Sequence, residues 1–429
     1  MIRPFNWRSL GGITLGILAL ISAYRYVSRH SQPPVEPPAI IRDGLRVGVI
    51  LPMTGSYSVV GKPLATVFPL LMRKVNACGG VNAAPVMFIL KDDRSDSTVA
   101  SRAMVELAFA DNVQALVGGI TSAAASEMVK NLERLEVPIV SPASTSIDIP
   151  IQARNWKYAG LYWARTIPSD ADEAKALADL AIARSITSIA IVAIDDEYGR
   201  AFARTFTSAF QNQGGTIATG DTPIFMDGRS PTPEDPALAE RLAEADAVLI
   251  IAYPDSGGPW LREALAKKLL GDRQLLLTSS VYTPRFLEAI GSSAENNTLL
   301  QGALGLTPGT NSSAYLPLKT LWEGQEGYAP PAFAAQTWDA AALVLLAAEA
   351  SGQNSSQGIA KELRRVANPP GIEVSDICRG LELVRRGEDI NYQGASGSVD
   401  LDANGNVTGQ YDVWTVDDQG RFDVLYSLK

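Results

Sequence analysis

Residues 45–51, Leu45-Arg-Val-Gly-Val-Ile-Leu51, decide the fold. A nearly uninterrupted apolar run of this length is typical of a β-strand that is buried on both faces, as in a parallel sheet. An amphipathic segment from about Pro63 to Asn76 follows and predicts a helix. A strand followed by a helix is the repeating unit of α/β folds, so the sequence predicts that such a fold begins here.

The same alternation continues through most of the chain. Helical patterns lie between most of the further predicted strands, which are Val86–Leu90, Gln114–Val117, Val137–Val140, Ser188–Ile194, Ala247–Ala252 and Gln274–Thr278. Parallel strands need such crossover connections, so we predict an α/β fold with doubly wound parallel sheets. In the last third, Asn404-Gly405 and Gln419-Gly420 predict hairpin turns between antiparallel strands, at residues 398–407 and 416–422.

Length and composition limit the number of lobes and the kind of partner. The 429 residues, 46% of them hydrophobic, exceed one ordinary domain and suffice for two lobes with separate cores. The 37 Lys and Arg residues against 46 Asp and Glu residues give a net charge of −9. A surface of this charge repels polyanions, so no nucleic-acid partner is predicted.

Residues 1–44 are predicted to form a signal or membrane anchor, residues 1–30, and a proline-rich linker, residues 31–44. The charge-free run from Ser9 to Tyr24 is shorter than the roughly 20 apolar residues that a spanning helix prefers, which favours a cleaved signal peptide. The bulky Ile21 at the candidate cleavage site favours an uncleaved anchor, in which residues 9–27 attach the protein to the inner (cytoplasmic) membrane. In both alternatives we expect the body from Leu45 to be periplasmic or otherwise extracytoplasmic.

The sequence predicts no enzyme, no cofactor and no metal site. The only histidine, His30, lies beside the predicted anchor, so the body offers no Ser-His-Asp triad and no histidine-ligated metal. Asp400, Asp402 and Asn404 imitate the start of a calcium loop, but Tyr411 stands where the bidentate glutamate belongs. Cys78 and Cys378 are too few for a disulfide scaffold, and either one long-range bridge or two free thiols is compatible with the sequence.

Three loops follow predicted strands, and ligands of open α/β sheets bind at such carboxyl ends. In the loop 117–122, Ser122 either grips a carboxylate or simply caps the next helix. In the loop 140–145, the Thr145 hydroxyl and the Ala143 N–H either hold the same anion or belong to a polar turn. In the loop 195–199, Tyr198 either covers a ligand with its ring or closes a helix structurally.

Several short motifs occur in one order along the chain: Leu51-Pro-Met-Thr-Gly-Ser-Tyr57, Asp92-Asp93, Gly118–Ser122, Pro138–Thr145 and Asp196–Gly199. In this order and spacing they resemble the leucine/isoleucine/valine-binding family of type I periplasmic binding proteins, from about Leu45 to the C-terminus. The resemblance implies two lobes that are joined by a three-crossing hinge and close over a small ligand. It also implies that the loaded protein delivers this ligand to an ABC permease in the membrane.

The resemblance also assigns roles to residues. Ser122, Ala143 and Thr145 would hold a carboxylate, and Tyr198 and Tyr253 would cover the ligand from the second lobe. We expect the first lobe to comprise residues 45–165 and 307–411, and the second lobe to comprise residues 166–306 and 412–429.

One departure from the family pattern leaves the ligand open. Amino-acid binders of the family usually carry an acidic residue after the strand that matches residues 274–278, whereas this chain has Ser279-Ser280-Val-Tyr282. A buried ammonium without an acidic partner costs roughly several kcal/mol. Either another acid serves, with Asp255 the nearest candidate unless it is a solvated turn carboxylate, or Ser279, Ser280 and Tyr282 bind a neutral polar ligand such as an amide.

Two functions are therefore compatible with the sequence. The first is a substrate-binding protein of an ABC transporter that captures an amino acid or a related small polar molecule. The second is a membrane-tethered receptor that senses such a ligand and signals without transport, because this fold class does not determine the output.

Overall fold

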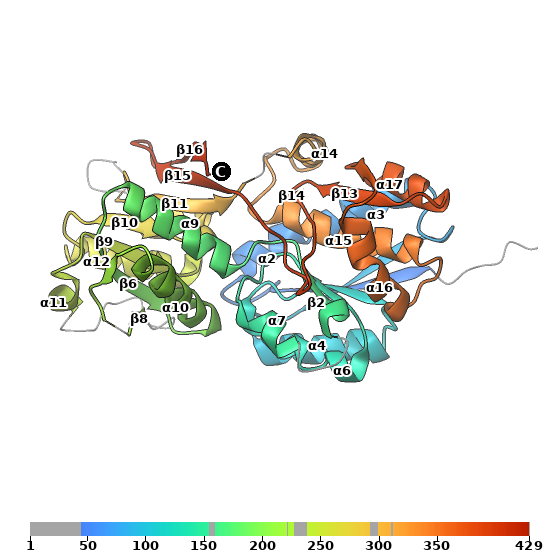
Figure 1. The fold of residues 1–429 in the computed structure, drawn as a ribbon, viewed down its shortest axis with the longest axis horizontal. Coiled ribbons are helices and arrows are strands. Elements are labelled where there is room, and N and C mark those ends of the chain that lie inside the picture. Colours follow the sequence, from blue (N-terminus) through green and yellow to red (C-terminus); the bar gives the residue numbers. More distant parts are fainter. Residues whose placement is uncertain are drawn as a thin grey trace, which may run out of the picture. The chain divides into compact units, whose positions relative to one another are not determined.

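Two large β-sheets organise the chain, as the ribbon in Figure 1 shows. The computed structural model describes residues 44–153, 159–220, 222–226, 238–291, 299–309 and 312–428. The predicted anchor and all of the linker except Gly44 lie outside the described residues. Within the described part of the chain, no helix is both long and apolar enough to cross a membrane.

The first sheet has five strands in the order β2-β1-β3-β4-β5, and all neighbouring pairs are parallel. Its strands are β1 (Leu45–Leu51), β2 (Val86–Asp92), β3 (Ala115–Gly118), β4 (Ile139–Ser141) and β5 (Trp163–Arg165). The predicted strand at residues 45–51 is confirmed and lies at an interior position of the sheet. Six of its seven residues are buried, because helices cover both faces.

The second sheet has the order β16-β15-β11-β10-β9-β6-β7, with β8 also paired to β6. Its strands are β6 (Ser188–Ile194), β7 (Thr216–Ile217), β8 (Ile224–Met226), β9 (Ala247–Ile251), β10 (Gln274–Leu277), β11 (Leu304–Pro308), β15 (Tyr411–Val416) and β16 (Phe422–Ser427). The strands from β6 to β11 are parallel, whereas β15 and β16 are antiparallel additions at one edge. The doubly wound α/β fold class is thus confirmed.

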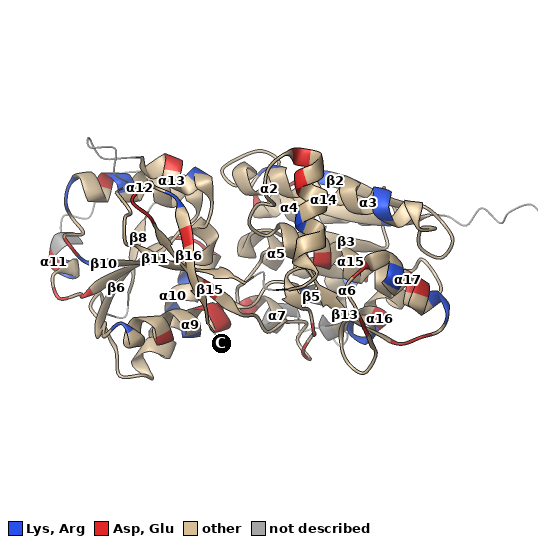
Figure 2. Cartoon of the chain, turned by 90° about the horizontal axis from the view of Figure 1, so that it is seen from above, with Lys and Arg blue, Asp and Glu red and all other residues tan. Residues whose placement is uncertain are grey.

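Helices pack on both sheets and give each its own apolar core. Around the first sheet lie α2 (Ser58–Leu64), α3 (Val67–Ala77), α4 (Ser97–Phe109), α5 (Ser122–Val129), α6 (Leu132–Leu135), α7 (Asp148–Ala153), α8 (Ala159–Tyr162), α14 (Tyr315–Glu326), α15 (Ala334–Ala350), α16 (Ser356–Ala367) and α17 (Ile377–Arg385). Around the second sheet lie α9 (Asp170–Ala183), α10 (Glu197–Gln211), α11 (Leu238–Leu242), α12 (Pro254–Ala266), the short 3₁₀ helix η2 (Ser279–Val281) and α13 (Pro284–Ile290). Charged residues of both signs lie intermixed on these helices (Figure 2).

The chain passes between the two sheets three times, after β5, after β11 and before β15. The expected lobe boundary between residues 306 and 307 falls inside β11, which continues to Pro308 and pairs with β15. The exact division of the chain into lobes stays a prediction.

One of the two predicted hairpins is wrong. Gly420 has a φ of 72°, and the turn there joins the antiparallel strands β15 and β16, as expected. The turn at Asn404-Gly405 joins no hairpin, because β14 (Gly397–Ser398) pairs with β13 (Ile390–Gly394) in a small sheet with β12 (Ile372–Val374), while β15 belongs to the second sheet. The Asp402 carboxylate accepts hydrogen bonds from the backbone of Asn404 and Asn406, which closes the turn locally.

Cys78 and Cys378 form a disulfide between the end of α3 and the first turn of α17. The bridge spans 300 residues of sequence and resolves the alternative that the sequence left open. It connects α3, which follows the first strand of the first sheet, with α17, the last of the helices around this sheet.

We expect the variant Cys78→Ser/Cys378→Ser to lose about 2–5 kcal/mol of unfolding free energy, because the bridge restricts the unfolded chain over a long loop. Urea unfolding of the variant and of the wild type measures the loss. The wild type in a reducing buffer is the control and is expected to match the variant. Equal stability of all three samples would contradict the prediction.

Candidate functional site

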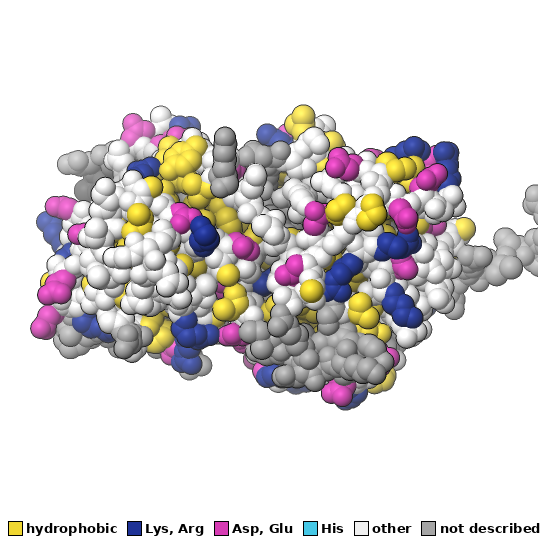
Figure 3. Space-filling model, viewed as in Figure 1, with side chains coloured by type: hydrophobic (Ala, Val, Ile, Leu, Met, Phe, Trp, Pro, Cys, Tyr) yellow, Lys and Arg dark blue, Asp and Glu magenta, His cyan; other side chains and the backbone are white. Residues whose placement is uncertain are grey.

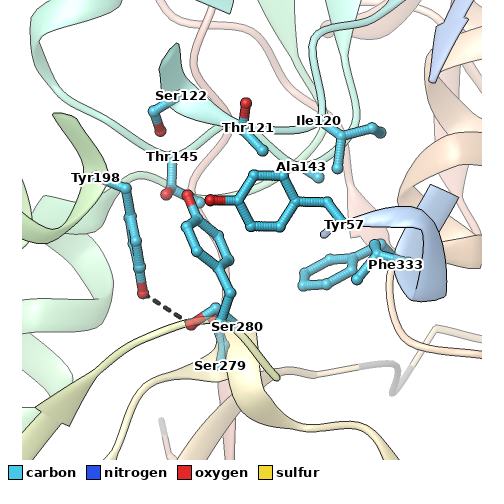
Figure 4. A pocket seen from close by; sticks show the side chains of 12 residues that line it. Tyr57, Ile120, Thr121, Ser122, Ala143, Thr145, Tyr198, Ser279, Ser280 and Phe333 are labelled. Carbon is cyan, nitrogen blue, oxygen red and sulfur yellow. Dashed lines mark hydrogen bonds between the residues drawn. The ribbon is translucent and has the colours of Figure 1, made fainter. Parts of the chain in front are cut away.

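A pocket lies where the carboxyl ends of strands from both sheets meet, and Figure 4 shows its side chains. It encloses about 500 Å³ of space outside the atoms, of which about 40 Å³ can be reached by the centre of a water molecule, so it is narrow. We call it the tyrosine pocket. Its lining residues are Tyr57, Val60, Ile120, Thr121, Ser122, Ala143, Thr145, Tyr198, Tyr253, Ser279, Ser280 and Phe333.

The loop after β3 brings its polar groups into the pocket through glycines. Gly119 has a φ of 74°, and a Cβ atom on Gly118 would lie 2.3 Å from the Ile50 carbonyl oxygen, so neither position accepts a side chain without strain. Thr121, and not Ser122, caps helix α5 by accepting a hydrogen bond from the Ala124 N–H. Ser122 is therefore not the cap that the sequence allowed, and its side chain lies in the pocket wall.

A buried arginine fixes the loop after β4. The Arg165 guanidinium donates to the carbonyl oxygens of Ser144 and Ser146 at 3.2 and 3.0 Å. Burial lowers the Arg165 pKa to about 10. The Ser146 N–H donates to the Ser122 hydroxyl oxygen at 3.3 Å, which ties this loop to the preceding one. Ala143 and Thr145 are thus held in place, although the sequence analysis did not identify Arg165.

The second wall is a connected set of hydroxyl groups. Asp196 caps helix α10 and thereby places Tyr198 in its first turn. The Tyr198 phenol donates to Thr278 at 2.9 Å and lies 3.0 Å from the Ser280 hydroxyl, a contact drawn in Figure 4. The Ser280 hydroxyl in turn donates to the carbonyl oxygen of Ala252. Tyr198 is 4% exposed and is part of the pocket wall.

Two more tyrosines, one after a strand of each sheet, are in ring contact. The Tyr57 ring follows β1, and its centroid lies 4.5 Å from that of Tyr253, which follows β9. Tyr253 also lies 5.2 Å from Tyr198, measured between ring centroids. Burial raises the pKa of each of these phenols, so all three remain neutral hydrogen-bonding groups. Tyr57 belongs to the motif Leu51–Tyr57 but was not predicted as a lining residue, although it follows a strand as the other lining loops do.

Glu173 on α9 is the acid that contacts the stretch after β10. Its carboxylate accepts hydrogen bonds from the Ser279 N–H at 2.6 Å and from the Ser279 hydroxyl at 2.7 Å. Burial raises the Glu173 pKa to about 8. The Ser279 N–H and hydroxyl are therefore already donating to Glu173. No local sequence pattern predicts this partner, which lies 106 residues away.

A second buried acid, Asp170, lies at the start of α9. Its side chain is fully buried, and neither carboxylate oxygen receives a hydrogen bond of good geometry from the described residues. Burial raises the Asp170 pKa to about 7, while the nearby Thr145 hydroxyl and Arg165 oppose this shift. The Asp170 N–H donates to the Thr145 carbonyl oxygen at 2.9 Å, so Asp170 lies directly behind a residue that lines the pocket. Asp170 was not among the site residues predicted from the sequence.

Two candidate residues lie outside the tyrosine pocket. Tyr282 packs against Trp414 and Phe422, with ring centroids 5.5 and 4.5 Å away. The Asp255 carboxylate forms an ion pair with Arg285 at 3.2 Å. Asp255 thus lies in the first turn of α12 and is paired with a cation, neither in the pocket nor in a solvated turn. The other seven candidates, Ser122, Ala143, Thr145, Tyr198, Tyr253, Ser279 and Ser280, line one pocket.

Replacing Glu173 by Gln is expected to change how stability depends on pH. The folded protein keeps a proton on Glu173 up to pH about 8, whereas an unfolded glutamate loses it near pH about 4.3. The unfolded state therefore binds fewer protons between these values, and the contribution of Glu173 to stability falls as the pH rises. The unfolding free energy of the variant, relative to wild type, should thus increase from pH 5 to pH 8 in urea titrations. The exposed Glu288→Gln is the control, and a constant difference for Glu173→Gln would contradict the prediction.

Comparisons with known proteins agree with this fold. A family model described as periplasmic binding protein matches residues 44–377. The substrate-binding protein BasB of a chemotactic signal transduction system in Halobacterium salinarum is 27% identical over 373 residues, which cover 83% of each chain.

Two solved structures share the fold. The branched-chain amino acid transporter substrate-binding protein LivJ of Streptococcus pneumoniae, in complex with isoleucine, has a TM-score of 0.71 and 17% identity, over 90% of this chain and 100% of LivJ. A solute-binding protein of an ABC transporter from R. palustris, in complex with benzoate, has a TM-score of 0.71 and 17% identity, over 90% of this chain and 96% of that protein.

Proposed function

We propose, from the premise that this chain belongs to the leucine/isoleucine/valine-binding-protein-like family of type I periplasmic binding proteins, that it is an extracytoplasmic substrate-binding protein of an ABC transporter. It captures an amino acid or a related small polar molecule and delivers it, chemically unchanged, to a membrane permease. The observation that carries this proposal is the tyrosine pocket, in which loops from the carboxyl ends of both sheets converge.

One end of the tyrosine pocket suits a carboxylate. Ser122 and Thr145 supply hydroxyl groups there, and both lie on the same side of the pocket in Figure 4. Ser122 is also the first residue of α5, whose unpaired backbone N–H groups favour negative charge. In this proposal the Ala143 backbone N–H adds a third donor.

Asp170 suits the ammonium group of the same ligand. Its buried carboxylate lacks hydrogen-bond partners of good geometry among the described residues, and an ammonium group donates up to three hydrogen bonds. Asp170 thereby takes the place of the acidic residue that the family usually carries after the strand corresponding to β10. The proposal thus favours an amino acid over a neutral amide.

The opposite end of the pocket suits the ligand's side chain. Tyr57, Ile120 and Phe333 lie together there, away from Ser122 (Figure 4). Apolar and aromatic walls of this kind recognise apolar groups by burial and ring packing. Isoleucine and benzoate in the two similar structures place an apolar group next to a carboxylate, which supports an apolar stretch beside the carboxylate of the ligand here.

We propose that two lobes close and trap the ligand. The lobes are divided as the sequence predicts, except that all of β11 belongs to the second lobe. Hydrogen bonds from Ser126 on α5 to Glu197 on α10, and from Arg204 on α10 to Asp148 on α7, connect the two sides of the pocket. Contacts of this kind form only in a closed state, and a ligand shifts the population toward it. An anchor within residues 1–30 would keep the protein beside its permease.

A second candidate function is ligand sensing without transport. BasB, a relative over most of this chain, carries a name that assigns it to chemotactic signal transduction. Lobe closure can be detected by a membrane receptor as well as by a permease, because both interact with the closed surface. Transport of labelled ligand into cells that contain or lack this protein distinguishes the two functions.

An amino acid is expected to raise the melting temperature of the full chain, because a ligand that binds only the folded state stabilises it. The variant Ser122→Ala/Thr145→Ala should lose this shift, since each hydrogen bond to a charged group contributes about 1.5–3 kcal/mol. A thermal-shift screen with amino acids, amides and short carboxylates measures it.

The control Thr98→Ala/Ser313→Ala also removes one threonine and one serine hydroxyl, but at exposed positions outside the pocket. It should keep the full shift. Stabilisation by neutral amides alone would contradict the proposed ligand class, and an unchanged shift in the Ser122→Ala/Thr145→Ala variant would contradict the carboxylate site.

Amino-acid binding is expected to release a proton near pH 6.5. Free Asp170 has a pKa of about 7, and an ammonium group beside it favours the ionised carboxylate. Affinity should therefore increase as the pH rises from 6 to 8. Calorimetry in two buffers of different ionisation enthalpy counts the released protons, and Asp170→Asn should abolish the release. Proton release that persists in Asp170→Asn would place the ammonium elsewhere.

A further inference from the structure

A second cavity lies on the other side of Phe333 from the tyrosine pocket. Its lining includes Tyr282, Tyr315, Gln336, Asp412 and Val424, and we call it the Asp412 cavity. It encloses about 820 Å³ outside the atoms, of which about 280 Å³ can be reached by the centre of a water molecule. This space is larger than the corresponding space in the tyrosine pocket.

Phe333 lines both cavities and is the partition between them. It stands directly before α15 with a φ of 66°, in the left-handed region that a bulky residue rarely adopts. Strained backbone of this kind concentrates at ligand clamps and switch regions. The side-chain end of the tyrosine pocket, where Phe333 and Tyr57 lie, therefore adjoins the Asp412 cavity.

The chemistry of the Asp412 cavity is that of a cation site. Asp412 is the charged residue among its described lining residues and is 8% exposed. Its carboxylate accepts a hydrogen bond from the Ser427 hydroxyl at 2.5 Å. Among the described residues, no lysine or arginine forms an ion pair with Asp412, and Arg285 and Arg421 pair with Asp255 and Asp417 instead.

Aromatic rings add to this preference. Tyr282 and Tyr315 both line the cavity, and ring faces attract cations. Burial raises the Tyr282 pKa, and the nearby negative charge of Asp412 raises it further. The Asp412 carboxylate and the Tyr282 phenol are therefore neighbours in the cavity wall. Val424 is 48% exposed at the rim, where apolar side chains gather over β15 and β16 (Figure 3). These groups suit the apolar stem of a chain that ends in a positive charge.

We propose that the Asp412 cavity is a specificity subsite for the cationic end of the ligand, and that the preferred ligand is an amino acid whose side chain ends in an ammonium or guanidinium group. The proposal rests on the proposed function, because the tyrosine pocket must hold the amino-acid head. Phe333 shifts to let the side chain pass into the cavity, where Asp412 pairs with its charge.

The test compares lysine with norleucine, which lacks only the terminal amino group, by calorimetry on the full chain. We expect lysine or arginine to bind at least tenfold more tightly than norleucine. Asp412→Asn keeps the acceptor for Ser427 but removes the charge, and should abolish this preference while changing the norleucine affinity less than threefold. The control Asp423→Asn removes an exposed carboxylate of the neighbouring strand and should leave the preference intact.

Tyr315→Leu provides a second variant, which should reduce the lysine preference about twofold to fivefold through loss of the ring face. Equal or tighter binding of norleucine by the wild type would overturn the inference and leave the proposed function standing. An undiminished lysine preference in Asp412→Asn would overturn it as well. If no amino acid binds, leucine included, both the inference and the proposed function are wrong.

Discussion

The geometry of the parallel sheet is the constraint on which the rest of the structure depends. Parallel strands end at one common edge, and the loops there lead into helix N-termini with unpaired N–H groups. This chain presents two such edges, and every strand that supplies the tyrosine pocket, β1, β3, β4, β6, β9 and β10, does so from its carboxyl end. The polar walls are therefore a product of sheet direction, and the identities of a few loop residues adapt them to a ligand.

What the sequence predicted well were features with a local cause. The strand Ser188–Ile194 was predicted to the residue, because a continuous apolar run has few alternatives. Seven of the nine candidate residues line one pocket for the related reason that they follow apolar runs directly. Asp170, Glu173 and Arg165 escaped prediction because their importance arises from burial. A charged residue in the first turn of a helix, like Asp170 and Glu173, or at the end of a strand, like Arg165, looks like an ordinary solvated residue until the fold covers it.

The differences from the expected geometry have the same physical origin. Tyr282 and Asp255 stand close in sequence to residues that line the tyrosine pocket, yet η2 and α12 turn them away from it. Tyr282 packs on Phe422 and lines the Asp412 cavity, and Asp255 pairs with Arg285. The Asn404-Gly405 turn is formed as its residues require, but strand partners are chosen by the sheets, and β15 pairs with β11 instead of returning to β14. Local chemistry specifies a turn, whereas only tertiary packing specifies which strands it connects.

The triple passage of the chain between the two sheets determines the order in which the protein can fold. The core of the first sheet includes Leu343 and Leu381, and the core of the second includes Trp414. A ribosome therefore releases more than three-quarters of the chain before the first core can be completed, and the second core waits for residues made later still. Co-translational folding of one finished domain after another is not available to this topology. The nascent chain remains incompletely packed, which is the condition in which a polypeptide can be threaded through a membrane.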